Sequence, residues 1–298
     1  MNAPAAPVLH IDWLFADDGA RLRRGHWRPA APRGRVLLLQ GLSELLEKYT
    51  EVAARLCALG FEVWSFDWRG QVDSASGERP PVDAFARHLR DLESVLADLP
   101  PGPPPLLLAH SMGAHLALRL LLDRPYPFAR AVLCAPMLGV RTWPWPGRVA
   151  RHLARLMIRL GQGHRSLPGR RHYTPLIIPF AINPFTSDRP HYERLRQRIE
   201  NDPGLAFGQV DWYWLAAAFD SLHRLHAADP ARLATPMTLL LAGHDQVVDS
   251  RAAAAFAARL PQAQVHWVAG ARHELLQEAP AIQAEVWTAI DRVFGQPV

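Results

Sequence analysis

The chain has 298 residues, 49% of them hydrophobic and 20% charged, which is the balance of a globular protein with a large apolar core. Its formal net charge of +5 is mildly basic, but no nucleic-acid-binding motif accompanies the charge, so we expect no nucleic-acid partner. The first residues lack the basic and apolar regions of a signal peptide, and no run of about 18 apolar residues follows. We therefore expect a cytoplasmic chain that does not cross a membrane. Cys57 and Cys134 lie in no metal-binding spacing and are expected to be buried thiols in a reducing compartment.

Short apolar runs alternate with helical stretches, which predicts a mostly parallel twisted sheet with helices on both faces. The first two strands, 8–15 and 20–27, flank the turn signal Asp18-Gly19 and should form an antiparallel edge. Buried strands are then expected at 35–40, 61–67, 105–110, 131–135, 237–242 and 264–268, and helices at 49–59, 113–123, 251–260 and 279–294. Gly60 should end the first of these helices.

The alternation stops between Met137 and about Leu233, where helix-like segments and loop residues replace buried strands. Strands resume after this stretch, so it is an insertion within one sheet. The pattern predicts an α/β core of residues 1–137 and 234–298, with a helical cap of residues 138–233 over the carboxyl edge of the sheet.

A nucleophile motif stands where an expected strand gives way to a helix. Ala109-His110-Ser111-Met112-Gly113 places a serine at a sharp strand-to-helix turn, which directs its hydroxyl toward a substrate. Such a turn is strained and needs small residues two positions before and after the serine, as Ala109 and Gly113 are. The alternative is a serine that only caps the helix. The surrounding order of elements favours a catalytic nucleophile at Ser111.

The partners of such a serine follow on loops after later strands, first the acid and then the histidine. Asp245 directly follows the strand 237–242, at the edge of the sheet where ligands bind, and is the predicted acid. Asp249 is the alternative, but it is better placed to cap the next helix. His273 follows the last strand and is the predicted base, which would take the serine proton and return it to the leaving alcohol. His110 and His244 flank catalytic positions and are expected to support them.

The tetrahedral intermediate of acyl transfer needs two backbone N–H donors for its oxyanion. Met112, directly after the nucleophile, is one candidate. The second donor should come from the loop after the strand 35–40, where Gly41-Leu42 permits a tight turn, and we nominate Leu42. Taken alone, Gly41 is better explained as an ordinary turn glycine.

With these residues identified, the chain resembles the monoglyceride lipase and bacterial lysophospholipase L2 group of α/β-hydrolase fold serine hydrolases. The resemblance spans about residues 8–294, and the motifs that carry it, besides the Asp245 and His273 loops, are Gln40-Gly41-Leu42-Ser43-Glu44, Glu47-Lys48-Tyr49, Asp67-Trp68-Arg69-Gly70-Gln71, His110-Ser111-Met112-Gly113, Ala135-Pro136-Met137 and Thr186-Ser187-Asp188. It implies an α/β core with a helical cap, no cofactor, no metal, and hydrolysis of fatty-acyl esters of glycerol or glycerophosphate type through an acyl-enzyme on Ser111.

Three positions depart from the pattern of this group. Gln40 stands where the oxyanion loop usually has His, and Ala109 where the elbow usually has Gly. Val72-Asp73 follows the Arg69-Gly70-Gln71 segment where another glycine is usual. None of the three removes a predicted catalytic group.

The expected cap has an unusual charge distribution. From Leu138 through Ser187 there is no Asp or Glu, whereas eight arginines occur: Arg141, Arg148, Arg151, Arg155, Arg159, Arg165, Arg170 and Arg171. Apolar Val149, Leu153, Leu156 and Leu160 recur there at helical spacing beside the arginines Arg148, Arg151, Arg155 and Arg159, after Trp143 and Trp145. A basic amphipathic helix of this kind suits an anionic membrane surface. The alternative is a helix that packs its apolar face on the core and only solvates its arginines.

Other functions remain open on the sequence alone. The same three catalytic residues would serve a short-chain carboxylesterase or a perhydrolase of the same fold, and a non-catalytic ligand-binding member would keep the fold without turnover. Trp212-Tyr213-Trp214 would line an acyl pocket or simply belong to the core. Because fold does not determine substrate, acyl-chain length and head group stay undetermined at this stage.

Overall fold

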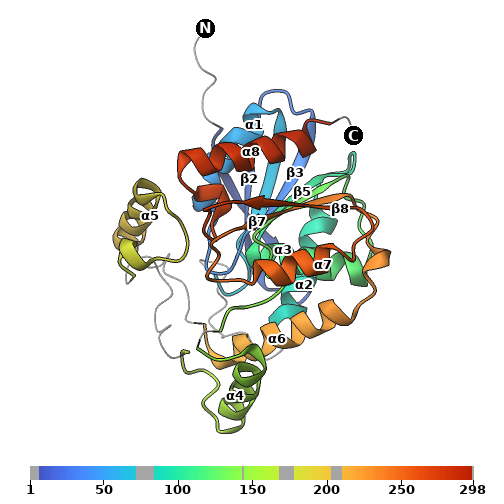
Figure 1. The fold of residues 1–298 in the computed structure, drawn as a ribbon. Helices are drawn as coiled ribbons and strands as arrows, with labels where there is room; N and C mark the ends of the chain where they lie inside the picture. Colours follow the sequence, from blue (N-terminus) through green and yellow to red (C-terminus); the bar gives the residue numbers. More distant parts are fainter. Residues whose placement is uncertain (1–6, 72–83, 143, 168–177, 203–209, 297–298) are drawn as a thin grey trace.

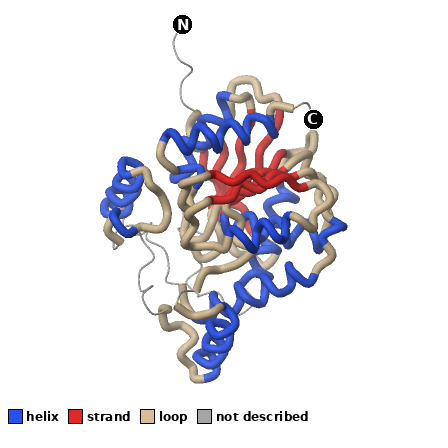
Figure 2. The backbone as a smooth tube through the Cα atoms, in the orientation of Figure 1, coloured by secondary structure: helices blue, strands red, loops and turns tan. Residues whose placement is uncertain are grey.

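The computed structural model describes residues 7–71, 84–142, 144–167, 178–202 and 210–296. An eight-stranded sheet runs through its centre in the order β1-β2-β4-β3-β5-β6-β7-β8 (Figures 1 and 2). The pairs β1–β2 and β2–β4 are antiparallel, and all other neighbours are parallel. The predicted mostly parallel sheet with an antiparallel edge is therefore confirmed.

The strands are β1 (His10–Phe15), β2 (Arg21–Trp27), β3 (Gly34–Leu39), β4 (Phe61–Phe66), β5 (Leu106–His110), β6 (Ala131–Cys134), β7 (Met237–Ala242) and β8 (Ala263–Val268). The α-helices are α1 (Thr50–Ala58), α2 (Ala84–Asp98), α3 (Ser111–Asp123), α4 (Gly147–Arg159), α5 (Arg189–Asn201), α6 (Trp212–Ala227), α7 (Ser250–Ala257) and α8 (Pro280–Phe294). Short 3-10 helices are η1 (Leu46–Tyr49), η3 (Phe180–Ile182), η5 (Pro230–Arg232) and η6 (Leu275–Gln277).

Alternate residues of the central strands face two separate cores, one on each side of the sheet. In β5, Leu106 and Leu108 belong to the core that α1 and α8 cover, whereas Leu107 and Ala109 belong to the core that α2, α3 and α7 cover (Figure 1). A strand buried on both faces needs apolar residues at every position, and this explains the continuous apolar runs of the sequence.

The structure extends the expected elements in two places. Helix α2 was not predicted, although Phe85, Leu92, Val95 and Leu96 recur at helical spacing and are buried in the core beside α3. The 3-10 helix η1 precedes α1, so this helical region begins at Leu46 rather than at residue 49. The remaining strands and core helices lie within two or three residues of the expected bounds.

Between β6 and β7, the described residues form helices and no strand of the sheet. Helix α4 packs on α6, where Ala150 and Ala154 form a small apolar core with Trp212, Leu215 and Ala216. Helix α6 in turn contributes to the core on the α2 and α3 side. Within the described part of the chain, no helix combines the length and apolar character needed to cross a membrane.

Candidate active site

Ser111 occupies the sharp turn between β5 and α3. Its backbone adopts φ = 50°, a left-handed conformation that is strained for a residue with a side chain. A Cβ atom on Gly113 would lie 2.4 Å from the carbonyl oxygen of Gln40 and 2.7 Å from that of Leu39, so this position admits only glycine without a backbone shift. The local strain and the small residue are the features that the motif predicts for an exposed nucleophile.

Three side chains from the ends of different strands form a hydrogen-bonded chain. His273 Nε2 lies 2.9 Å from Ser111 Oγ, and His273 Nδ1 lies 2.8 Å from Asp245 Oδ2. Asp245 follows β7 and His273 follows β8, while Ser111 follows β5. The structure thus brings together the three residues that the sequence nominated.

The charged forms of Asp245 and His273 stabilise each other. Burial disfavours the charged imidazolium of His273, but the nearby Asp245 carboxylate outweighs burial and raises the pKa of His273. Burial likewise opposes the charged form of Asp245. His273 and the N–H groups of Val247 and Val248, which donate to Oδ1 at 2.8 and 2.9 Å, lower the pKa of Asp245 below its ordinary value. Asp245 therefore stays ionised and holds a histidine that accepts a proton readily.

Asp249 has a different position from Asp245. Its Oδ1 accepts hydrogen bonds from the backbone N–H groups of Arg251 and Ala252 and so caps α7. The two aspartates of this loop therefore have the separate structural places that their sequence positions suggested.

Leu42 and Met112 both line the pocket that contains Ser111 and His273. Met112 lies in the first turn of α3, where helix geometry leaves backbone N–H groups without an intrahelical partner. The loop around Leu42 is a tight turn. The N–H of Gly41 donates to the Glu44 side chain, and Ser43 has a left-handed backbone with φ = 59°. Gln40 anchors the start of the loop, because its amide donates to the Phe66 carbonyl at 2.8 Å.

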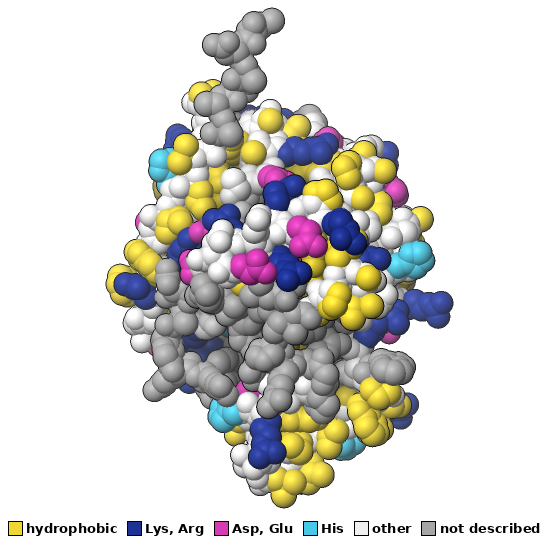
Figure 3. Space-filling model, turned by 90° about the vertical axis from the view of Figure 1, so that its left-hand side faces the viewer, with side chains coloured by type: hydrophobic (Ala, Val, Ile, Leu, Met, Phe, Trp, Pro, Cys, Tyr) yellow, Lys and Arg dark blue, Asp and Glu magenta, His cyan; other side chains and the backbone are white. Residues whose placement is uncertain are grey.

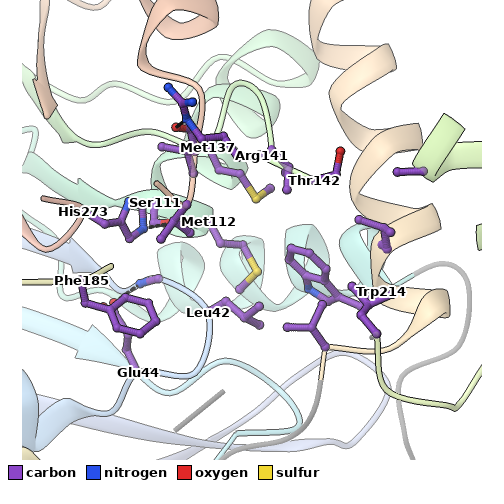
Figure 4. A pocket seen from close by; sticks show the side chains of 18 of the residues that line it. Leu42, Glu44, Ser111, Met112, Met137, Arg141, Thr142, Phe185, Trp214 and His273 are labelled. Atoms are coloured by element: carbon purple, nitrogen blue, oxygen red, sulfur yellow. Dashed lines mark hydrogen bonds between the residues drawn. The ribbon is translucent and has the colours of Figure 1, made fainter. Parts of the chain in front are cut away.

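A largely apolar pocket opens from Ser111 toward the inserted segment (Figure 4). Core residues supply the reactive end, and the insertion supplies most of the apolar wall, including Leu153, Leu215 and Trp214. Trp212 and Trp214 both line it, so the aromatic run singled out in the sequence does contribute to the pocket. Phe185 lies beside Ser111 and His273 at the other end (Figure 4).

Behind the reactive residues lies a buried charged cluster that sequence reasoning missed. Lys48 Nζ contacts Glu44 Oε1 at 2.6 Å and Glu274 Oε1 at 2.8 Å. Tyr49 donates to Glu44 at 2.6 Å, and His110 Nδ1 lies 3.2 Å from the same carboxylate. The available signal was the single lysine of the chain in an otherwise arginine-rich sequence.

The two histidines expected to support the site behave differently. His110 directly precedes Ser111, and its Nε2 lies 3.2 Å from the backbone carbonyl oxygen of His273. The side chain of His110 therefore links the strand end that carries the nucleophile to the loop that carries the base. His244 is exposed, and its backbone N–H donates to the Ala271 carbonyl in the His273 loop at 2.9 Å. His244 therefore contacts the loop of the base through its backbone, and its supporting role stays a prediction.

A second buried carboxylate joins the inserted segment to the loop of the base. Glu278 Oε2 accepts hydrogen bonds from the N–H and the hydroxyl of Ser187 at 2.7 and 2.5 Å. Its Oε1 accepts from the N–H of Arg272 at 2.6 Å, directly before His273. The Glu274 N–H also donates to the Phe185 carbonyl at 2.8 Å. The motif Thr186-Ser187-Asp188 thus lies against the His273 loop.

Both cysteines of the chain lie among the described residues. Cys57 and Cys134 are free and buried, as expected, and burial raises the pKa of the Cys57 thiol to about 11. Across the described residues, no group of three His, Cys, Asp or Glu side chains is arranged to hold a metal ion. Val72-Asp73, Trp143, Arg170 and Arg171 lie outside the described residues.

Comparison with known proteins gives consistent matches along most of the chain. A family model described as serine aminopeptidase, S33 (Hydrolase_4) matches residues 30–280. Lysophospholipase L2 of Escherichia coli (strain K12) is 30% identical over a 279-residue alignment that covers 88% of this chain and 80% of that protein. Monoglyceride lipase of Homo sapiens is 26% identical over a 299-residue alignment that covers 97% of this chain and 92% of that protein.

Solved structures show the same fold at lower sequence identity. A soluble variant of monoglyceride lipase from Saccharomyces cerevisiae has a TM-score of 0.73 and 17% identity, and the match covers 98% of this chain and 97% of that one. A thermostable carboxyl esterase from Bacillus coagulans has a TM-score of 0.70 and 16% identity, with 95% and 96% of the two chains covered.

Proposed function

The chain belongs to the Hydrolase_4 family (serine aminopeptidase, S33), has the α/β-hydrolase fold and is a carboxylic ester hydrolase; from this premise we propose that it hydrolyses fatty-acyl esters such as lysophospholipids or monoacylglycerols. The observation that carries the proposal is the Ser111–His273–Asp245 hydrogen-bonded chain at one end of an apolar pocket. The reactive groups suit acyl transfer, and the apolar wall suits a hydrocarbon chain.

In the proposed reaction, Ser111 Oγ attacks the ester carbonyl carbon while His273 Nε2 takes the hydroxyl proton. The tetrahedral intermediate collapses when His273 returns this proton to the leaving alcohol, which leaves an acyl-enzyme on Ser111. Water then attacks the acyl carbonyl, with His273 again accepting and returning a proton, and the fatty acid leaves. Asp245 holds the tautomer of His273 and stabilises its imidazolium form.

We assign the oxyanion hole to the backbone N–H groups of Leu42 and Met112. Both residues line the pocket beside Ser111, and the Met112 N–H lies at the start of α3, where the helix dipole favours negative charge. The Glu44 contact with Gly41 keeps the Leu42 loop in place before substrate arrives.

We propose that residues 138–233 act as a cap over a core of residues 1–137 and 234–298. Cap residues Leu153, Leu215 and Trp214 would surround the acyl chain, whereas core residues carry the chemistry. The matched family is described as serine aminopeptidase, S33. An aminopeptidase would need an unpaired carboxylate to bind the ammonium group at the start of its peptide substrate. Among the described residues, the carboxylates that line this pocket are Glu44 and Glu274, and both pair with Lys48, which favours the ester over the peptide.

We also propose a cytoplasmic protein that contacts anionic membrane surfaces through α4. Both cysteines are free, as in a reducing compartment. On α4 and its start, Trp145, Leu156 and Leu160 have exposed fractions of 53%, 50% and 61%. Hydrophobic and basic side chains gather at the corresponding end of the molecule (Figure 3, bottom). This surface would bring the pocket to lipid esters in a bilayer.

The proposal is tested by a hydrolysis panel. Purified protein is given p-nitrophenyl esters of increasing chain length, a monoacylglycerol and a lysophospholipid, with Ser111→Ala as the control. Ser111→Ala should abolish hydrolysis, with a loss of at least about 10⁴-fold in kcat, and leave the melting temperature nearly unchanged because no core contact is lost.

Three other results of these assays would contradict parts of the proposal. Activity confined to short esters would keep the catalytic residues but replace the lipid substrate with a short-chain ester. Turnover retained by Ser111→Ala would contradict the nucleophile assignment. A fluorophosphonate probe that fails to label the wild-type protein at Ser111 would indicate a non-catalytic binder.

A further inference from the structure

The charge of the pocket is unevenly placed. Of the described residues that line it, Arg141 is the only lysine or arginine. It lies at the start of the inserted segment, on the same side of the pocket as Met137 and away from Trp214 (Figure 4). A cation on the wall of a largely apolar pocket influences which charged substrates enter.

The Arg141 side chain is anchored without being neutralised. Its backbone N–H donates to the Val247 carbonyl and its Nε to the Val248 carbonyl, each at 3.1 Å. Its two terminal amino groups make no hydrogen bond or ion pair within the described part of the chain. The guanidinium is therefore oriented by the loop that carries Asp245, and its terminal donors remain free for a ligand.

The carboxylates closest to the pocket have other partners than Arg141. Glu44 and Glu274 share Lys48 on the far side of the reactive residues. Asp249, which lines an adjoining surface hollow with Arg141, accepts two N–H groups of α7. None of these three carboxylates forms an ion pair with Arg141 within the described part of the chain, so its terminal amino groups stay available to a ligand.

We propose that Arg141 binds an anionic phosphate on the alcohol part of the ester and so makes this protein selective for glycerophosphate esters over neutral glycerol esters. The proposal rests on the ester hydrolysis proposed above. With the ester carbonyl at Ser111 and the acyl chain along Leu153 and Trp214, the alcohol part lies toward the rim, where two parallel N–H donors of a guanidinium match two phosphate oxygens.

The test compares two substrates with the same decanoyl chain, below their micelle concentrations: lysophosphatidylglycerol, which is anionic, and monoacylglycerol, which is neutral. The measured quantity is the ratio of their kcat/KM values. Arg141→Gln should lower this ratio about 10- to 100-fold, because one charge-assisted pair is lost. Arg165→Gln removes the same charge from an exposed position outside the pocket and should leave the ratio unchanged.

An inhibition experiment tests phosphate binding by Arg141 directly. Glycerol 3-phosphate should inhibit hydrolysis of a neutral p-nitrophenyl ester competitively in the wild type, and at least 10-fold more weakly in Arg141→Gln. An unchanged substrate ratio in Arg141→Gln, with both esters still hydrolysed, would overturn the role of Arg141 alone. Failure of the wild type to hydrolyse either ester would instead contradict the proposed function.

Discussion

At the scale of single residues, the strained backbone of Ser111 explains why its neighbours are small. A left-handed residue with a side chain costs about 1–3 kcal/mol and persists only where the surroundings impose it. Here the helix α3 starts so close to β3 that a side chain at Gly113 would collide with two backbone carbonyls. Ala109 is fully buried at the preceding strand and replaces glycine without displacing Ser111 from His273.

The protonation of His273 determines how the rate should depend on pH. Because a general base must be neutral to accept the Ser111 proton, kcat/KM should fall as the pH drops through the pKa of His273 in the free enzyme. Asp245 raises this pKa above the ordinary 6.5, so the half-maximal rate should lie above pH 6.5. A pH–rate profile with a soluble ester measures it, and a midpoint below 6.5 would contradict the stabilising role of the carboxylate.

At the scale of elements, α4 shows what a pattern reveals and what it leaves undetermined. Its helical spacing was visible in the sequence, but whether the apolar stripe faced the core was not. The structure packs Ala150 and Ala154 on α6 and leaves Val149, Leu156 and Leu160 exposed. The basic stripe is also smaller than expected, since Arg151 and Arg155 both pair with Asp220 at 2.8 Å.

This arrangement sharpens the membrane prediction. Arg148 and Arg159 carry no ion pair within the described residues and flank the exposed apolar stripe, so they should carry most of the attraction to anionic lipid. Replacing both with Gln should weaken binding to phosphatidylglycerol-containing vesicles by about 2 kcal/mol at low salt, or about 30-fold. Arg232→Gln with Arg251→Gln makes the same charge change elsewhere as a control. Equal vesicle binding by both double variants, in co-sedimentation, would leave α4 as a solvated surface.

At the scale of the whole molecule, apolar periodicity and the order of elements along the chain were enough to predict the sheet and the three catalytic residues. The buried strands were located by their apolar runs, and Ser111, Asp245 and His273 by their places after β5, β7 and β8. Contacts between distant segments left no such pattern. Lys48 gives no local sign that it meets Glu274, and Glu278 none that it binds Ser187, because these contacts arise only when the loops converge at the edge of the sheet.

The Lys48 cluster ties three such segments together: η1, the end of β5 through His110, and the His273 loop through Glu274. Burial opposes the charged form of Lys48, yet the two carboxylates outweigh burial and raise its pKa, so the ammonium stays charged. Lys48→Met would leave two buried carboxylates without a counter-ion. Removing one partner from such a cluster should destabilise the fold by about 3–5 kcal/mol.

The matched variants make this prediction specific. Lys48→Arg keeps the charge and should lose much less stability than Lys48→Met when unfolding midpoints are compared in the same buffer. Lys48→Met combined with Glu274→Gln removes one uncompensated carboxylate and should recover part of the loss, because the penalty comes from unpaired charge rather than from lost packing. If Lys48→Met melted at the wild-type temperature, the cluster would not hold these loops. If the double variant were the least stable of the three, the penalty would come from lost contacts instead of charge.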